Sequence, residues 1–199
     1  MLFTASMLIK TRLLVSAFAV LAPAIASADS VVIEHADPSY RSGLVLGASI
    51  DGGDMGCQTK NGDDCGNGSH DAGGISLHAG GMVAPSLAIL GEVWGMAHTE
   101  DTLTESQVLV TANLRGWIAP RLWLQGGLGV ARSEVSYKNG QLMASDMSDT
   151  VPAFDAAIGV EVIRSPGFAL DIEARTGSGF YQGDARVYDA ALGVGVSWF

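Results

Sequence analysis

The last eleven residues, Asp189 to Phe199, read D-A-A-L-G-V-G-V-S-W-F. On an extended chain, one face of this segment would carry Ala190, Leu192, Val194, Val196 and Trp198, and the other face Asp189, Ala191, Gly193, Gly195 and Ser197. A period of two residues is that of a β-strand, whose successive side chains point to opposite faces. The segment therefore predicts a strand with an apolar face towards lipid and a small or polar face towards a lumen.

The same alternation recurs upstream. It predicts seven further strands at residues 41–50, 73–83, 87–97, 107–118, 122–131, 152–163 and 168–176, before the last strand at 186–199. Three Pro-containing segments, V-A-P-S-L from Val83, I-A-P-R-L from Ile118 and R-S-P-G-F from Arg164, join strands as tight turns. Polar segments at 51–72, 99–105, 132–151 and 177–185 join the others as loops.

This order of elements predicts an all-β fold. Four hairpins joined by three tight turns make an eight-stranded antiparallel up-and-down transmembrane β-barrel at residues 41–199, with the turns at one end and the loops at the other. A water-soluble barrel is the alternative, but its apolar face would point inwards. Strand 87–97 leaves its orientation open, because Leu90, Trp94 and Met96 share a face with Glu92.

The N-terminal segment predicts export. Lys10 and Arg12 precede an apolar run at 13–22, and Ala26-Ser27-Ala28 supplies a small-residue cleavage site. We expect a signal peptide at 1–28, removed after transport across the inner membrane, and a polar lead-in at 29–40. A membrane helix is the alternative, but the apolar run is shorter than the ~20 residues that a span needs. Together with the barrel, the signal predicts the outer membrane of a Gram-negative bacterium.

The charge of the chain is strongly negative. Residues 1–28 hold two of the 11 basic residues and none of the 21 acidic ones, so the remainder carries 9 basic and 21 acidic residues, a net charge of −12. Such a chain repels phosphate backbones, and we expect no nucleic-acid partner.

The predicted inner faces collect nine ionisable residues, which we treat as a lumen charge cluster. They are His78, Glu92, Arg115, Asp155, Glu161, Asp171, Glu173, Arg175 and Asp189. Carboxylates dominate, which suits a path that prefers cations. The alternative is a lumen filled by hydrogen-bonded ion pairs, and we favour it because eight strands enclose little more than their own side chains.

The turn at Ala84-Pro85-Ser86 predicts a register. If Val83 faces Leu87 across a three-residue connection, His78 lies opposite Glu92 and Ser76 opposite Trp94. Ser76, His78 and Glu92 are also the residue types of a hydrolytic triad, but we expect an interior Glu-His pair instead. Near the turn end, Trp117 and Trp123 have inward parity, so either the alternation breaks there or they cap the lumen.

The first loop holds both cysteines. Cys57 and Cys65 bracket seven residues in a segment that the predicted leader would deliver to an oxidising compartment, so we expect a disulfide. Two free thiols are the alternative. Asn61, Asp63 and Gly66 have the spacing of a calcium loop, but Ala72 stands where a bidentate Glu is required, so we predict no metal there.

The alternating strands, the tight turns against long loops and the terminal V-S-W-F resemble the small outer-membrane barrels of the OmpA/OmpX and opacity-porin type. The resemblance covers residues 41–199. It implies a monomer in contact with outer-membrane lipid, without cofactors, whose terminal Trp198 and Phe199 are read by the barrel-assembly machinery. One departure is that Ser197 stands where the family's terminal signal usually has an aromatic.

For function, we expect a non-enzymatic structural or surface-interaction role carried by the loops, whose ligand the sequence does not name. A narrow cation-preferring channel is the first alternative, and a lipid-modifying enzyme the second. The Ser and His motif of outer-membrane lipid A deacylases has no match in the chain.

Overall fold

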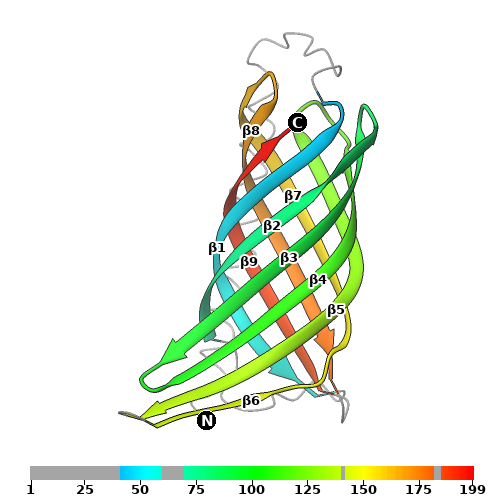
Figure 1. Cartoon of the computed structure of the whole chain (residues 1–199). Helices are drawn as coiled ribbons and strands as arrows, with labels where there is room; N and C mark the ends of the chain where they lie inside the picture. The colour runs from blue at the N-terminus through cyan, green and yellow to red at the C-terminus, as the bar shows by residue number, and fades with distance from the viewer. Residues whose placement is uncertain (1–40, 60–69, 140–141, 182–184) are drawn as a thin grey trace, which may run out of the picture. The chain divides into compact units, whose positions relative to one another are not determined.

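The computed structural model describes residues 41–59, 70–139, 142–181 and 185–199 (Figure 1). The predicted signal peptide at 1–28 and lead-in at 29–40 lie outside these residues. In the described part of the chain, no helix is long and apolar enough to cross a membrane.

Nine strands are present among the described residues. They are β1 (Leu44–Gln58), β2 (His70–Ala84), β3 (Leu87–Glu100), β4 (Leu103–Trp117), β5 (Leu122–Asn139), β6 (Leu142–Met147), β7 (Val151–Ser165), β8 (Phe168–Phe180) and β9 (Arg186–Trp198). All except β6 form one antiparallel ring, in which β1 pairs with β9 and β4 with β5. The predicted eight-stranded up-and-down barrel is therefore confirmed.

Every strand of the ring alternates between an exposed apolar face and a buried face. Leu192 in the middle of β9 is 49% exposed, whereas Asp189 on the other face is 0% exposed. In β3, Glu92 points inwards and is buried together with Leu90, Trp94 and Met96, while Val93 is exposed on the outside. The orientation of strand 87–97 is thereby fixed. The apolar face of the barrel points outwards, the reverse of a water-soluble barrel.

The strands extend further at the loop end than predicted. β1 continues to Gln58, β2 begins at His70, and only Asp101 and Thr102 separate β3 from β4. The segment predicted as a loop at 132–151 instead continues β5 and adds β6, which pairs only with the outer part of β5 (Figure 1). These extensions carry no continuous apolar face. We expect them to project beyond the membrane, where strands can pair through their backbones without an apolar face towards lipid. The sequence pattern therefore missed them.

The tight turns lie at the upper end of the barrel in Figure 1, together with the C-terminus. Across the first turn the predicted register is confirmed, with His78 opposite Glu92 and Ser76 opposite Trp94. The predicted three-residue connection is wrong at its last step, because Ala84 pairs with Leu87 and a bulge lies at Val83. A bulge adds one residue to one strand, which the alternation near a turn cannot reveal.

Candidate functional site

The interior of the barrel is the place where the predicted charges meet. All nine residues of the lumen charge cluster point inwards, and none is more than 7% exposed. Their side chains come from six strands, β2, β3, β4, β7, β8 and β9. Because the lumen is narrow, long side chains such as Glu92 and Arg115 reach partners on strands that do not pair with their own.

Glu92 on β3 is the centre of the largest network. Its Oε1 accepts a hydrogen bond from Arg175 Nη1 at 2.6 Å, and its Oε2 accepts one from Gln125 Nε2. Arg175 also lies 3.2 Å from Glu173 Oε1, and its guanidinium stacks 4.9 Å from the Trp94 ring. β3 and β8 do not pair in the wall, so this ion pair crosses the lumen.

Arg115 on β4 holds the next part of the interior. Its Nε donates to Gln125 Oε1 at 2.8 Å, its Nη1 donates to Ser197 Oγ at 3.3 Å, and its guanidinium lies 4.1 Å from the Trp123 ring. His78 Nε2 lies 3.3 Å from Ser197 Oγ and 3.5 Å from Arg115 Nη1. These polar contacts join β4 to its wall neighbour β5 and, across the lumen, to β9 and β2.

The expected Glu-His pair is therefore wrong, although the register that suggested it is right. Glu92 is engaged by Arg175 and Gln125, and the His78 Nε2 faces Ser197 and Arg115 instead. A cross-strand position fixes which Cα atoms are neighbours in the wall. It does not fix the partner of a long side chain that can cross the lumen.

A second network lies at the turn end and includes a residue that the sequence did not indicate. Arg41 Nη2 lies 2.9 and 2.8 Å from the two carboxylate oxygens of Glu161, and Trp117 Nε1 donates to Glu161 Oε1 at 2.7 Å. The Arg41 guanidinium also lies 4.5 Å from the Trp117 ring, and Phe199 packs against that ring edge to face at 5.8 Å. The first strand was predicted to begin at Arg41, but β1 begins only at Leu44, so Arg41 lies just before the strand.

The interior is layered along the barrel axis. Two buried apolar clusters lie inside the barrel: a loop-end layer of Met55, Ala72, Trp94, Met96, Leu109, Ala131, Val151, Ala153 and Ala191, and a turn-end layer of Val45, Ala88, Leu90, Trp117, Trp123 and Ala157. Along β3 the inward residues run from Leu90 in the turn-end layer through Glu92 to Trp94 in the loop-end layer. The polar network is thus enclosed between two apolar layers, and Trp117 and Trp123 cap the lumen.

The remaining carboxylates of the cluster differ in how they are satisfied. Asp189 is fully buried, and within the described residues neither of its carboxylate oxygens has a hydrogen-bond partner. The same holds for both polar atoms of the Gln107 side chain, which is also 0% exposed. Buried groups of this kind are usually satisfied by ordered water.

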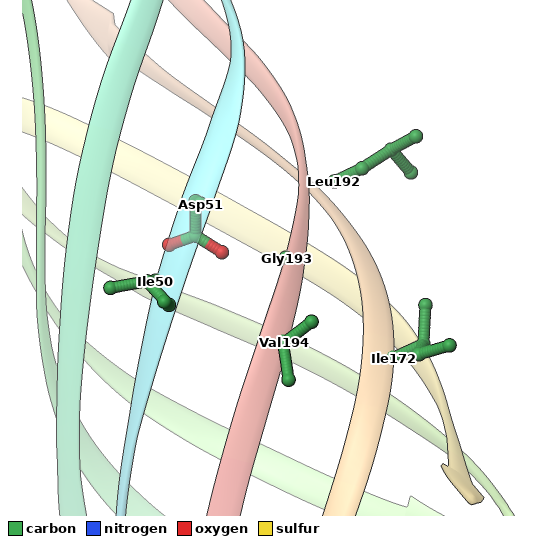
Figure 2. Close-up of a pocket in the computed structure, with 6 residues that line it drawn as sticks. All are labelled: Ile50, Asp51, Ile172, Leu192, Gly193 and Val194. Atoms are coloured by element: carbon green, nitrogen blue, oxygen red, sulfur yellow. The ribbon is translucent and has the colours of Figure 1, made fainter.

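The outer wall carries a shallow apolar depression over β1, β8 and β9 (Figure 2). It is lined by Ile50, Asp51, Ile172, Leu192, Gly193 and Val194. A Cβ at Gly193 would overlap with Asp51 Oδ1, so this carboxylate lies directly against the inner side of the glycine. The depression itself exposes mainly hydrocarbon, which suits contact with lipid and supplies no reactive group.

Solved structures with the same architecture include bacterial surface and outer-membrane proteins. The attachment invasion locus protein Ail of Yersinia pestis is 17% identical, with a TM-score of 0.58 over 79% of this chain and 99% of that one. Neisserial surface protein A is 16% identical, with a TM-score of 0.56 over 79% of this chain and 97% of that one. The chain has the fold of the small outer-membrane barrels. No family model matches the sequence, and no curated protein matches it.

In this small barrel, the two terminal aromatics have different surroundings. Trp198 is exposed on the outer face, where its ring lies 5.8 Å from that of Phe168 on β8. Phe199 packs instead on Trp117 at the turn-end layer, and its backbone N–H donates to Gly167 O at 3.1 Å. Trp198 is therefore the aromatic that faces outwards, which accounts for the unusual Ser197 on the inner face.

The predictions for the first loop remain predictions. Cys57 lies at the end of β1, but Cys65 lies outside the described residues, as do Asn61, Asp63 and Gly66 of the calcium-like spacing.

Proposed function

We propose that this chain is a monomeric integral outer-membrane barrel, without catalytic activity or a conducting lumen, that meets its surroundings through its loop end. The observation that carries the proposal is the filled interior. Glu92, Arg115 and Arg175 lie within an ion-pair and hydrogen-bond network between the two apolar layers, and all three are 5% exposed or less. The closed ring of eight strands also leaves no free strand edge in the barrel wall for self-association.

The channel alternative requires a continuous polar path. Conduction needs sites that an ion can enter and leave, with water replacing the ion between passages. Here Trp94, Met96 and Leu109 obstruct the loop end and Trp117 and Trp123 obstruct the turn end. The two apolar layers therefore support a closed lumen over a cation pathway, despite the excess of carboxylates.

The enzyme alternative requires a nucleophile in contact with its base. The Ser76 hydroxyl lies 2.8 Å from Ser49 Oγ, while His78 faces Ser197 and Glu92 faces Arg175. Ser76, His78 and Glu92 therefore belong to the interior network, and all three are buried away from lipid. The arrangement supports a structural role for each of them.

The loop end supports contact with a cationic partner. Among the described residues there, acidic side chains (Asp54, Asp71, Glu100, Asp101, Glu105, Glu134, Asp146 and Asp149) outnumber basic ones (Arg132, Lys138 and Arg186). Ail has been solved in complex with sucrose octasulfate, a heparin analogue. An acidic surface repels such polyanions, so we expect this chain not to bind a heparin analogue.

The proposal is tested in two steps. An epitope tag inserted between Asn139 and Leu142, at the tip of the β5–β6 hairpin, should be accessible to antibody on intact cells, whereas a tag inserted at Arg121 should need permeabilised cells. Vesicles that contain the barrel should then adhere to polylysine and not to heparin, with adhesion falling as salt rises. Accessibility of the Arg121 tag alone, or salt-sensitive retention on heparin, would contradict the proposal.

A further inference from the structure

Three metal-ligating side chains meet at the loop end of β2 and β3. His70 is the first residue of β2, and His98 and Glu100 end β3. One nitrogen or oxygen atom from each lies within 4.8 Å of the other two, and the two imidazole rings are stacked with centroids 4.6 Å apart. The backbone pairing of β2 with β3 ends at Gly73 and Ala97, so these side chains meet beyond the end of the strand ladder.

The surroundings of His98 fix which of its nitrogens is available. Nδ1 lies 2.7 Å from the carbonyl oxygen of Asp71. A carbonyl oxygen only accepts, so Nδ1 carries the proton and Nε2 of the neutral ring keeps its lone pair. A hydrogen bond from one ring nitrogen to a backbone carbonyl is the usual support of a metal-bound histidine, because it orients the ring and raises the basicity of the other nitrogen.

That second nitrogen has no partner of its own. Within the described residues, His98 Nε2 is shielded from solvent and makes no hydrogen bond, although Glu100 Oε2 lies 4.0 Å from it. A shielded acceptor without a donor is costly to maintain. A cation held between His98, His70 and Glu100 would satisfy it.

Glu100, the third side chain of the group, lies next to a tight turn. Glu100 pairs with Leu103, and the two residues between them include Asp101, whose φ of 52° is left-handed. The Glu100 side chain is 69% exposed and therefore free to swing. Glu105 lies opposite His98 on β4 and adds further negative charge to this part of the rim.

We propose that His70, His98 and Glu100 form a surface site for a divalent transition-metal ion of the zinc class. Two imidazole nitrogens and one carboxylate favour such ions over Ca²⁺ or Mg²⁺, which prefer oxygen ligands. Bonds of about 2.0–2.2 Å in a tetrahedral site place ligand atoms about 3.4 Å apart, so the side chains must close in, with the exposed Glu100 moving most. The ion cross-links β2 to β3 beyond their last backbone pair and leaves its fourth position to water.

The test is a titration of the oxidised, refolded protein in detergent micelles with ZnCl₂. Calorimetry should give one zinc per chain, and imidazole NMR should show shifts at His70 and His98 with none at the buried His78. Glu100→Gln should weaken zinc at least tenfold, and His98→Gln should abolish saturable binding. Glu134→Gln, a rim carboxylate on β5, is the matched charge control and should bind zinc like the wild type.

Two outcomes would overturn the site. One is the absence of saturable binding to a protein whose far-UV circular dichroism shows a folded barrel. The other is binding that survives Glu100→Gln and His98→Gln unchanged, since the zinc ligands would then lie elsewhere in the chain. Neither outcome bears on the filled lumen, so the two proposals stand or fall separately.

Discussion

Single residues decide how the interior is filled, and glycine matters as much as the large side chains. A Cβ at Gly159 on β7 would overlap with the ring of Trp123, which is buried in the turn-end layer. The indole of Trp123 therefore fits only because Gly159, its partner on the neighbouring strand β7, has no side chain. Gly126 on the outer face of β5 has no heavy atom near its own Cβ position.

We therefore expect Gly159→Ala to destabilise the barrel by about 1–3 kcal/mol, because Trp123 must leave its position. Gly126→Ala should change the free energy of unfolding by no more than about 0.5 kcal/mol. Urea unfolding from lipid vesicles measures both. Equal effects of the two substitutions would contradict the placement of Trp123.

The ion pair between Glu92 and Arg175 makes a second prediction for single residues. Arg175→Met leaves Glu92 buried with its charge unpaired, and the loss of one partner from a buried pair costs about 3–5 kcal/mol. Glu92→Gln added to Arg175→Met should recover part of that loss, since no unpaired charge then remains on residue 92. A double mutant less stable than Arg175→Met would show that the two side chains do not depend on each other.

The sequence predicted the face of each interior residue but not its partner. Alternation placed Glu92 and Arg175 in the lumen, because facing follows from a period of two residues. It could not pair them, since β3 and β8 are not neighbours in the wall. Arg41 stood at the start of the predicted strand 41–50 but was not counted among the lumen charges, and alternation named no partner for it.

At the scale of elements, the hairpin formed by the outer part of β5 and β6 lies outside the closed ring of the barrel. β5 pairs with β7 only between Leu122 and Ala131, and beyond that it pairs with β6. The Ser133 carbonyl accepts a hydrogen bond from Ser148 N–H at 2.9 Å, so the two strands are already side by side at the base of the hairpin. The polar composition of the segment concealed this hairpin from the sequence pattern.

Replacing residues 134–147 by Asn-Gly should therefore preserve the barrel. Asn-Gly is the favoured two-residue connection between antiparallel strands, and Ser133 and Ser148 already lie where such a turn begins and ends. We expect an unchanged electrophoretic shift on heating and a free energy of unfolding within about 1 kcal/mol of wild type. Failure of this variant to fold would show that the hairpin belongs to the barrel core.

At the scale of the whole molecule, the outer surface is an apolar belt and the interior is closed. Leu192 is the central residue of β9 and is exposed on this belt. Leu192→Arg should cost about 2–4 kcal/mol in vesicles, because a charge at the bilayer midplane is poorly solvated. Val135→Arg, at a position of similar exposure on the β5 extension beyond the barrel wall, should cost at most about 1 kcal/mol. The reverse order would contradict the position of the belt.

The filled lumen is the claim on which the proposed function depends most. The sequence predicted the charges that line it, but not the two apolar layers, because Leu109 lies between the polar Gln107 and Thr111 on the inner face of β4 and Trp117 follows Arg115 there. Their effect arises only when eight strands bring them together.

Recording from planar lipid bilayers tests this claim most directly. The purified barrel, with its insertion verified by recovery from the same membranes, should give no discrete conductance steps in molar KCl at either polarity. Stable steps with a preference for cations would contradict the account, because they would require a continuous aqueous path past Glu92 and Arg175.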